Sequence, residues 1–394
     1  MKAVVFHDIG DIRLEDVAEP VIEQPGDAVV RITASAICGT DLHMIRGTLP
    51  GMKPGTILGH EGVGVVEEVG KAVRNFRPGD RVVVPSTIAC GWCSYCRAGY
   101  TAQCDVANPN GPQAGTAFYG GPALSGPFMG MQAEFVRVPY AAHNLVRLPV
   151  EVSDEQALLC SDIFPTGYFG ADNAEIQPGD TVAVFGCGPV GQFAIMSAFM
   201  RGAHRVLAVD CLPDRLEMAR KQGAECIDFA AEEPVDVIRQ LTGGIGVDRA
   251  IDAVGVDAVA PPGQDFPDEV RQIAPQIRPV GDNWHPGNGP SQVLNWAVDG
   301  LAKAGTLSII GVYPETARTF PIGKAMNKNL VLKMGNCHHR TYIPDLLDAI
   351  HTGRIDPTSL LAQVQPLTSA LEAYKAFDTR QPGWLKVELL PKAA

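Results

Sequence analysis

The stretch TVAVFGCGPVGQFA, residues 181–194, passes from an apolar run to a glycine-rich turn and then to a segment of helical character. Its glycines, Gly186, Gly188 and Gly191, follow the pattern G-x-G-x-x-G. Glycines at this spacing let the turn tighten and let the backbone approach a pyrophosphate, which the N-terminus of the following helix stabilises. The stretch therefore predicts a strand, a turn and a helix that bind a dinucleotide.

The residues around this turn repeat the same alternation. From about residue 158, short apolar runs such as RVLAVD and VDRAIDAVG alternate with helix-length segments such as PDRLEMARKQG. Strand and helix in this order predict a doubly wound parallel sheet, the Rossmann arrangement, over residues 158–336. A proline-rich, polar insertion without a clear period interrupts this pattern at residues 257–290.

The first 157 residues have a different character. They contain short β segments separated by glycine and proline, among them DAVVRITASAIC and GVGVVEEVG. A length of 394 residues suits two cores better than one, and we expect residues 337–394 to return to the first domain. We therefore predict an α/β protein with a mostly β domain, residues 1–157 and 337–394, and a nucleotide-binding domain, residues 158–336.

Composition narrows the classes of partner. The formal net charge is −12, and an acidic chain does not drive counterion release from phosphates, so we exclude a nucleic-acid partner. No apolar run reaches the roughly 20 residues that cross a bilayer, and the N-terminus lacks a signal-peptide pattern, so we expect no membrane partner. We expect a cytosolic location, in which the ten cysteines stay reduced.

Four of these cysteines lie close together in CGWCSYCRAGYTAQC, at Cys90, Cys93, Cys96 and Cys104. Four thiolates can close a tetrahedron around Zn²⁺ and leave no open position, which is typical of a structural zinc. An iron–sulfur cluster is the alternative, because closely spaced cysteines also bind such clusters.

Asp210 ends the strand that follows the glycine turn. A carboxylate there can accept hydrogen bonds from the adenosine ribose and would repel a 2′-phosphate, which favours NAD(H) over NADP(H). Arg215, on the next helix, either contacts the same ribose or is a solvated helix charge. Further cofactor contacts are predicted in the turn and near the ends of neighbouring strands, at Pro189, Val190, Val254, Gly311 and Val312.

Two upstream segments, ICGTDLHMIRG and LGHEGVG, supply Cys38, Thr40, His43, His60 and Glu61. With the four cysteines and the glycine turn, they resemble the zinc-dependent medium-chain alcohol dehydrogenases across nearly the whole chain. The resemblance implies a GroES-like fold for the mostly β domain and a catalytic zinc bound by Cys38 and His60. It also implies a relay of Thr40, the nicotinamide ribose and His43 that carries the alcohol proton to solvent.

The third zinc ligand is expected at Asp162. In the family it stands four residues before the threonine of a T-G-Y segment, here Thr166, and this spacing selects Asp162 over Cys160. On a helix, residues two apart are rotated by about 200°, so Cys160 and Asp162 cannot face one metal, whereas Asp162 and Thr166 share a face. Glu61 is expected to orient the neighbouring ligand His60 or to exchange as a ligand itself, and we favour the first role.

The resemblance also assigns two cofactor contacts. Thr166 is expected to support the nicotinamide ring. Lys386, in GWLKVEL, is either a basic contact to the pyrophosphate or a surface charge.

Within the family, Asp162, the segment SDIFPTGY and the insertion look most like the glutathione-independent formaldehyde dehydrogenases and formaldehyde dismutases. The resemblance implies hydride transfer between an alcohol or aldehyde hydrate and NAD(H), with two zinc ions per chain. The alternatives are a dismutase with tightly bound NAD, a polyol dehydrogenase that uses Glu61 as a ligand, and a metal protein without turnover. The complete set of polar site residues weighs against the last.

Two expectations concern the insertion and the assembly state of the protein. In the formaldehyde-metabolising relatives the insertion lies over the adenine end of NAD, and residues 257–290 either do the same or form a mobile surface loop. We also expect a homo-oligomer, a dimer or a tetramer.

Overall fold

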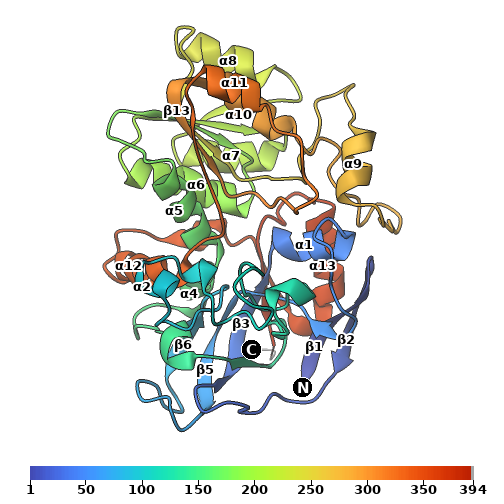
Figure 1. Ribbon diagram of the computed structural model, residues 1–394, viewed down its shortest axis with the longest axis vertical. Helices are drawn as coiled ribbons and strands as arrows, with labels where there is room; N and C mark the ends of the chain where they lie inside the picture. The colour runs from blue at the N-terminus through green and yellow to red at the C-terminus, as the bar shows by residue number, and fades with distance from the viewer. Residues whose placement is uncertain (392–394) are drawn as a thin grey trace. The chain divides into compact units, whose positions relative to one another are not determined.

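The computed structural model describes residues 1–391 and divides into two units, each with its own cores (Figure 1). Unit 1 consists of Met1–Pro165, Gln276–His285 and the chain from Cys337 onward, and unit 2 consists of Thr166–Pro275 and Pro286–Asn336. The two functional domains predicted from the sequence, with limits after residues 157 and 336, remain a prediction. The last three residues of the predicted 337–394 segment lie outside the described residues.

The described part of unit 2 contains a six-stranded parallel sheet in the order β11-β10-β9-β12-β13-β14. The chain starts at β9, continues to β10 and β11 on one side, and then crosses to β12, β13 and β14 on the other. The sheet is therefore doubly wound, as predicted, and its winding reverses between β9 and β12. The strands are β9 (Thr181–Phe185), β10 (Arg205–Asp210), β11 (Glu225–Asp228), β12 (Val247–Asp252), β13 (Leu301–Ile309) and β14 (Val331–Met334).

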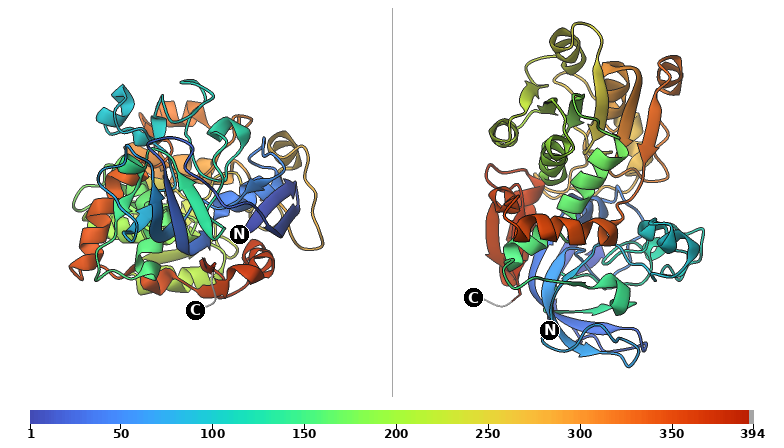
Figure 2. Two further views of the ribbon diagram at one scale, coloured as in Figure 1. Left: turned by 90° about the horizontal axis from the view of Figure 1, so that it is seen from below. Right: turned by 90° about the vertical axis from the view of Figure 1, so that its left-hand side faces the viewer.

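Side chains of β9 alternate between two apolar cores. Val182 and Val184 pack on the side of α5, α6 and α7, while Ala183 and Phe185 pack on the side of α8, α10 and α11. Helices thus cover both faces of the sheet (Figure 2), which explains the continuous apolar run of the strand. The helices are α5 (Ile163–Asn173), α6 (Pro189–Met200), α7 (Pro213–Lys221), α8 (Pro234–Leu241), α9 (Pro267–Ile273), α10 (Gln292–Gly300) and α11 (Ile322–Asn327).

Unit 1 is built on two sheets within residues 1–391. In the seven-stranded sheet the order is β15-β16-β3-β5-β6-β8, with β7 also paired to β3, and the smaller sheet has the order β2-β1-β4. The strands are β1 (Lys2–Asp8), β2 (Asp11–Asp16), β3 (Ala28–Ile37), β4 (Thr56–Ile57), β5 (Gly62–Val69), β6 (Arg81–Val84), β7 (Phe135–Val138), β8 (Val146–Arg147), β15 (Gln363–Pro366) and β16 (Val387–Leu390).

Helices and 3₁₀ turns connect and cover these strands. They are α1 (Gly39–Arg46), α2 (Ser94–Arg97), α3 (Ala141–Asn144), α4 (Asp154–Leu159), α12 (His339–His351) and α13 (Ala370–Asp378), with 3₁₀ turns η1 (Thr101–Gln103), η2 (Ala123–Ser125), η3 (Pro357–Leu360) and η4 (Leu367–Ser369). Across both units, none of the helices formed by residues 1–391 has the length and apolar character needed to span a bilayer.

Strand register in unit 1 brings three distant segments together. β3 pairs antiparallel with β5, with Ser35 opposite Gly62, and with β16, with Ile37 opposite Val387. The residues just beyond these pairs are Cys38, His60 and Lys386. The sheet therefore places them at one edge before any side-chain contact is considered.

The insertion is more ordered than its sequence suggests. Residues 267–273 form α9, and residues 276–285 belong to unit 1. Trp284 is only 4% exposed and packs in the apolar core of unit 1. This part of the insertion is therefore not a loose surface loop, and a lone tryptophan in a polar stretch was its only signal in the sequence.

A buried ion pair fixes this segment. Asp378 Oδ2 accepts hydrogen bonds from the Asn283 side chain at 3.0 Å and from the Trp284 backbone at 2.8 Å. Its Oδ1 accepts two hydrogen bonds from the Arg46 guanidinium, at 2.9 and 2.7 Å. One carboxylate thus joins α1, α13 and the insertion.

Asp378→Ala should lower the free energy of unfolding by about 3–5 kcal/mol, because it leaves the Arg46 guanidinium buried without its counter-charge. The matched control is Asp348→Ala, which removes the carboxylate of an exposed ion pair with Arg354 and should cost roughly 0–1 kcal/mol. Urea denaturation of both variants checks this, and equal midpoints would contradict it.

Candidate active site

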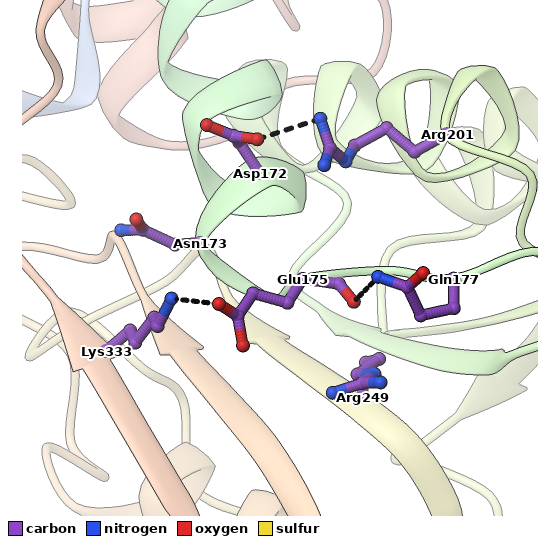
Figure 3. Close-up of a pocket in the computed structure, with 7 residues that line it drawn as sticks. All are labelled: Asp172, Asn173, Glu175, Gln177, Arg201, Arg249 and Lys333. Carbon is purple, nitrogen blue, oxygen red and sulfur yellow. Dashed lines mark hydrogen bonds and ion pairs between the residues drawn. The ribbon is translucent and has the colours of Figure 1, made fainter.

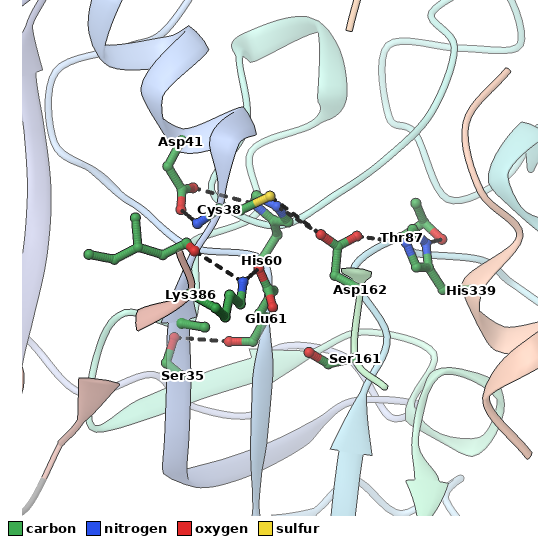
Figure 4. A network of polar contacts seen from close by, with 12 residues as sticks. Ser35, Cys38, Asp41, His60, Glu61, Thr87, Ser161, Asp162, His339 and Lys386 are labelled. Carbon is green, nitrogen blue, oxygen red and sulfur yellow. Dashed lines mark hydrogen bonds and ion pairs between the residues drawn. The ribbon is translucent and has the colours of Figure 1, made fainter. Parts of the chain in front are cut away.

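Cys38, His60 and Asp162 meet in the interior of unit 1 (Figure 4). Cys38 follows β3, His60 precedes β5, and Asp162 lies in the turn between α4 and α5. The Oδ2 atom of Asp162 lies 3.5 Å from Cys38 Sγ and 3.5 Å from His60 Nε2. All three side chains are buried, so three potential ligands converge on one small volume.

These distances fit a tetrahedral zinc ion. Ligand atoms about 2.0–2.3 Å from zinc in a tetrahedron lie about 3.3–3.8 Å from one another. The thiol, imidazole and carboxylate are also the donor types that zinc accepts. The residues present therefore fit the metal that the sequence analysis predicts.

Cys160 lies outside this group of potential ligands, although it is fully buried. It ends α4, and the helix does not continue through Ser161 and Asp162, which form a turn. The helical rotation argument is therefore wrong in its premise, because these residues do not lie on one helix. The turn nevertheless brings Asp162, and not Cys160, to Cys38 and His60.

Burial acts on both anionic ligands. It raises the pKa of the Cys38 thiol, an effect that the nearby His60 opposes and the carboxylates of Asp162 and Glu61 reinforce. Burial alone would raise the pKa of Asp162 as well, but hydrogen bonds from His339 and His60 hold it well below its usual range. The carboxylate is thus ready to bind a cation, while the thiol needs one to become a thiolate.

Asp41 supports two of these ligands from behind. Its Oδ2 accepts a hydrogen bond from the Cys38 backbone N–H at 3.0 Å, and its Oδ1 lies 3.3 Å from His60 Nδ1. A carboxylate on the far nitrogen of a ligating histidine fixes the ring and its tautomer. Asp41 was not predicted as a site residue, although it stands inside the segment ICGTDLHMIRG.

Glu61 and Lys386 form a second buried pair beside the cluster. The Lys386 ammonium contacts Glu61 Oε1 and donates a hydrogen bond to the Ile37 carbonyl at 3.0 Å. Both side chains have 0% exposure. Burial raises the pKa of Glu61 to about 7, against the opposing charge of Lys386.

The position of Lys386 corrects the sequence analysis, which offered a pyrophosphate contact or a surface charge. The structure buries its ammonium completely, and two of its three N–H groups are bonded inside unit 1. It neutralises Glu61 instead. The local sequence could not show this, since the contact joins the residues just before β5 and β16, the two strands that flank β3.

Thr40 and His43 stand on α1, directly after Cys38. Thr40 is partly exposed, whereas His43 is buried and its Nδ1 lies 2.8 Å from the Thr48 hydroxyl. The helix therefore presents both predicted relay residues close to the metal ligand. Their role in proton transfer stays a prediction.

His339 is a further residue that the sequence analysis did not identify. Its Nε2 lies 2.7 Å from Asp162 Oδ1, and its Nδ1 lies 3.1 Å from the Thr87 hydroxyl. The adjacent histidines at 338 and 339 were a possible signal, but no local pattern linked them to Asp162.

The four cysteines of residues 90–104 also converge. Cys90 Sγ lies 3.9 Å from Cys96 Sγ, and Cys93 Sγ lies 3.9 Å from Cys104 Sγ, close to the roughly 3.8 Å expected between thiolates on one tetrahedral zinc. Backbone N–H groups point at two of the sulfurs, at 3.2–3.4 Å. Such donors stabilise thiolates and support a closed zinc site.

The glycine turn of unit 2 has the close contacts that its motif predicts. Gly186 has φ +88°, and a Cβ atom at Gly191 would lie 1.8 Å from the Gly186 carbonyl oxygen. A side chain at either position is therefore excluded. α6 begins at Pro189, so its first N–H groups face the turn.

The predicted cofactor residues of unit 2 lie near this turn. Asp210 ends β10 and accepts hydrogen bonds from three backbone N–H groups, those of Cys187, Cys211 and Leu212. A carboxylate has about four acceptor sites, so Asp210 retains capacity for a ribose hydroxyl. The remaining predicted residues are located by contacts with glycines. Arg215 lies beside Gly188, and Val254 packs against Gly186. Gly255 contacts both Gly311 and Val312, and Phe193 contacts Gly167, the neighbour of Thr166.

A polar cavity of about 540 Å³ lies elsewhere in unit 2 (Figure 3). Its charged groups are paired: Arg201 with Asp172 at 2.8 Å, and Lys333 with Glu175 at 2.6 Å. Arg249 pairs with Asp180 at 2.8 Å. The charged side chains that line the cavity thus form ion pairs with one another or with a neighbouring residue. Their charges balance, so the cavity does not indicate a site for a charged ligand.

Comparison with known proteins places the chain in a family. Residues 24–150 match the alcohol dehydrogenase GroES-like domain, and residues 189–263 match the zinc-binding dehydrogenase family. The chain is 36% identical over 395 residues to the uncharacterized zinc-type alcohol dehydrogenase-like protein AdhB of Bacillus subtilis, across 99% of this chain and 100% of that protein. The chain belongs to the zinc-type alcohol dehydrogenase family.

Two further relatives match this chain over nearly their whole length. The solved structure of alcohol dehydrogenase TADH from Thermus sp. ATN1 has a TM-score of 0.82 at 34% identity, with 99% of each chain covered. The glutathione-independent formaldehyde dehydrogenase of Pseudomonas aeruginosa is 35% identical over 405 residues, 97% of this chain and 96% of that one. The predicted GroES-like and Rossmann folds and the oxidoreductase assignment are confirmed, and a metal protein without turnover is not supported.

Asp162→Ala should cost this zinc-type alcohol dehydrogenase one metal ion per chain, because only Cys38 and His60 then remain to hold a dication. Cys160→Ala is the matched control and should keep all metal, at a stability cost on the order of 1 kcal/mol. Zinc content and turnover of both variants check this. The reverse result would indicate a two-thiolate site, and retention by both variants would make Glu61 the third ligand.

Proposed function

We propose that this chain transfers hydride between an alcohol or an aldehyde hydrate and NAD(H), with formaldehyde hydrate as its preferred aldehyde substrate. The observation that carries the proposal is the placement of Asp162 Oδ2 at 3.5 Å from both Cys38 Sγ and His60 Nε2. The likeness of the SDIFPTGY segment to formaldehyde dehydrogenases supports the substrate class, as does the 35% identity to one of them.

The residues fit this chemistry by charge. Zinc held by Cys38, His60 and Asp162 would supply a Lewis acid for the substrate oxygen, and NAD would accept the hydride. Cys38 and Asp162 contribute two negative charges that match the dication. Lys386 compensates Glu61, so that carboxylate does not compete with the two ligands for the charge of the dication.

Thr40 and His43 are assigned the removal of the substrate proton. Both follow Cys38 on α1, and the hydrogen bond to Thr48 at 2.8 Å fixes the His43 ring. Oxidation of an aldehyde hydrate to the carboxylic acid sends one hydride to NAD⁺ and one proton to solvent. The relay carries that proton.

The cofactor assignment rests on unit 2. We assign the pyrophosphate to the glycine turn and the adenosine ribose to Asp210, whose carboxylate would repel a 2′-phosphate. Thr166 is assigned to the nicotinamide end, with Arg215, Val254, Gly311 and Val312 as further contacts. A second zinc in the four-cysteine segment, a homo-oligomer and a cytosolic location belong to the same proposal.

A polyol dehydrogenase is the second candidate, because Glu61 also offers a ligand atom within 4.8 Å of those of Cys38, His60 and Asp162. Lys386 weighs against it, since a ligating Glu61 would have to give up its ammonium partner. A dismutase is the third candidate and differs only in the fate of the NADH.

Asp210→Ala should weaken NADH binding by about tenfold or more, since each lost hydrogen bond to a charged acceptor contributes about 1.5–3 kcal/mol. NADPH binding should weaken less or improve, because the repelling carboxylate is gone. Fluorescence titration measures both dissociation constants. The control is Glu217→Ala, which removes an exposed carboxylate of α7 paired with Arg220, and unchanged NADH affinity in Asp210→Ala would assign the ribose to another residue.

Absorbance at 340 nm tests the reaction itself. With added NAD⁺, formaldehyde should raise the absorbance in proportion to the formate produced, and polyols should not. Methanol and formate in equal amounts without a lasting absorbance change would instead identify a dismutase. A response to polyols alone, or no response to any alcohol or aldehyde, would refute the formaldehyde assignment.

A further inference from the structure

The two carboxylate oxygens of Asp162 have different surroundings. Oδ2 faces Cys38 and His60, each at 3.5 Å, while Oδ1 lies 2.7 Å from His339 Nε2 (Figure 4). A carboxylate can bind a metal through one oxygen or both, and rotation about its last bond exchanges the two. A donor on Oδ1 opposes that rotation and directs Oδ2 to the metal.

The hydrogen bond to Asp162 requires a proton on His339 Nε2. A neutral imidazole carries one proton, so its Nδ1 must then accept a hydrogen bond. The Thr87 hydroxyl lies 3.1 Å from Nδ1 and can donate. Thr87 is 6% exposed and His339 is 4% exposed, so water does not compete for this geometry.

The neighbours of His339 hold its backbone in place. His338 Nδ1 accepts a hydrogen bond from the Ala102 backbone at 3.3 Å, and its ring packs edge-on against Tyr100 at 5.5 Å. On the other side, Arg340 Nε donates to the His143 carbonyl at 2.7 Å. The first turn of α12 is therefore tied to the four-cysteine segment and to α3.

We propose that His339 is a positioning residue for Asp162: it holds Oδ1 so that Oδ2 alone faces the metal, and Thr87 selects the ring tautomer that does so. The inference rests on the proposed metal site of Cys38, His60 and Asp162. No local sequence pattern links His339 to that site, since 177 positions separate it from Asp162.

The test compares two substitutions of similar bulk. His339→Leu removes the donor, whereas His339→Gln retains an N–H group that can reach Asp162. His351→Leu is the control, because it changes the partly exposed histidine at the other end of α12. In each protein the exchangeable zinc is replaced by Co²⁺, and its affinity is measured by chelator competition together with its visible spectrum.

His339→Leu should bind Co²⁺ about 10–100-fold more weakly, the usual loss when the partner of a metal ligand is removed. Its cobalt bands should also shift, because Asp162 is then able to offer both oxygens. His339→Gln should recover most of the affinity and the parental bands, and His351→Leu should match the parent.

If His339→Leu keeps the Co²⁺ affinity and the cobalt bands of the parent, the inference is overturned. This holds even if the variant melts at a lower temperature, because a purely structural role of His339 predicts lower stability without a change at the metal. If His339→Leu does not fold, Thr87→Val keeps the ring and removes its Nδ1 partner. It should show a smaller loss of affinity in the same direction, and parental values would again overturn the inference. If the unsubstituted protein binds no Co²⁺ at these residues, the proposed function fails and the inference fails with it.

Discussion

Negative charge buried in the interior of unit 1 is the constraint on which the site depends. Cys38, Glu61 and Asp162 are all at most 7% exposed, and a buried anion without a counter-charge costs several kcal/mol. Lys386 pairs with Glu61 and balances one of these charges, and a dication would balance the other two. The ammonium and the proposed metal are therefore complementary requirements of this cluster.

The sheet of unit 1 satisfies this constraint through register. β3 lies between β5 and β16, so Cys38, His60 with Glu61, and Lys386 leave the sheet at one edge. Asp162 arrives from the turn between α4 and α5, and Asp41 and His339 orient the ligands from outside the cluster. The hydrogen bond from His339 on Asp162 Oδ1 and the Asp41 carboxylate beside His60 Nδ1 would decide which lone pairs face a metal.

The candidate ligand site of unit 2 is built mainly from backbone groups. Its glycine turn offers N–H donors and close approach in place of charged side chains, and the reversal of winding between β9 and β12 opens the carboxyl edge of the sheet to a ligand. Asp210 adds one charge whose position backbone N–H groups fix on both oxygens. Unit 1 thus gathers charged side chains that fit a metal ion, whereas unit 2 offers a glycine turn whose backbone groups fit a phosphate.

The sequence by itself predicted the doubly wound sheet from the alternation of strands and helices, and the glycine turn and the four-cysteine segment from short spacing. The candidate ligands Cys38, His60 and Asp162 came from its resemblance to the zinc-dependent medium-chain alcohol dehydrogenases, because local helix geometry does not apply to the turn that carries Asp162. Only the tertiary structure decided that Lys386 pairs with Glu61, that His339 bonds to Asp162, and that Trp284 of the insertion packs into unit 1. Those contacts join residues far apart along the chain, and strand register and core packing, which no local pattern encodes, bring them together.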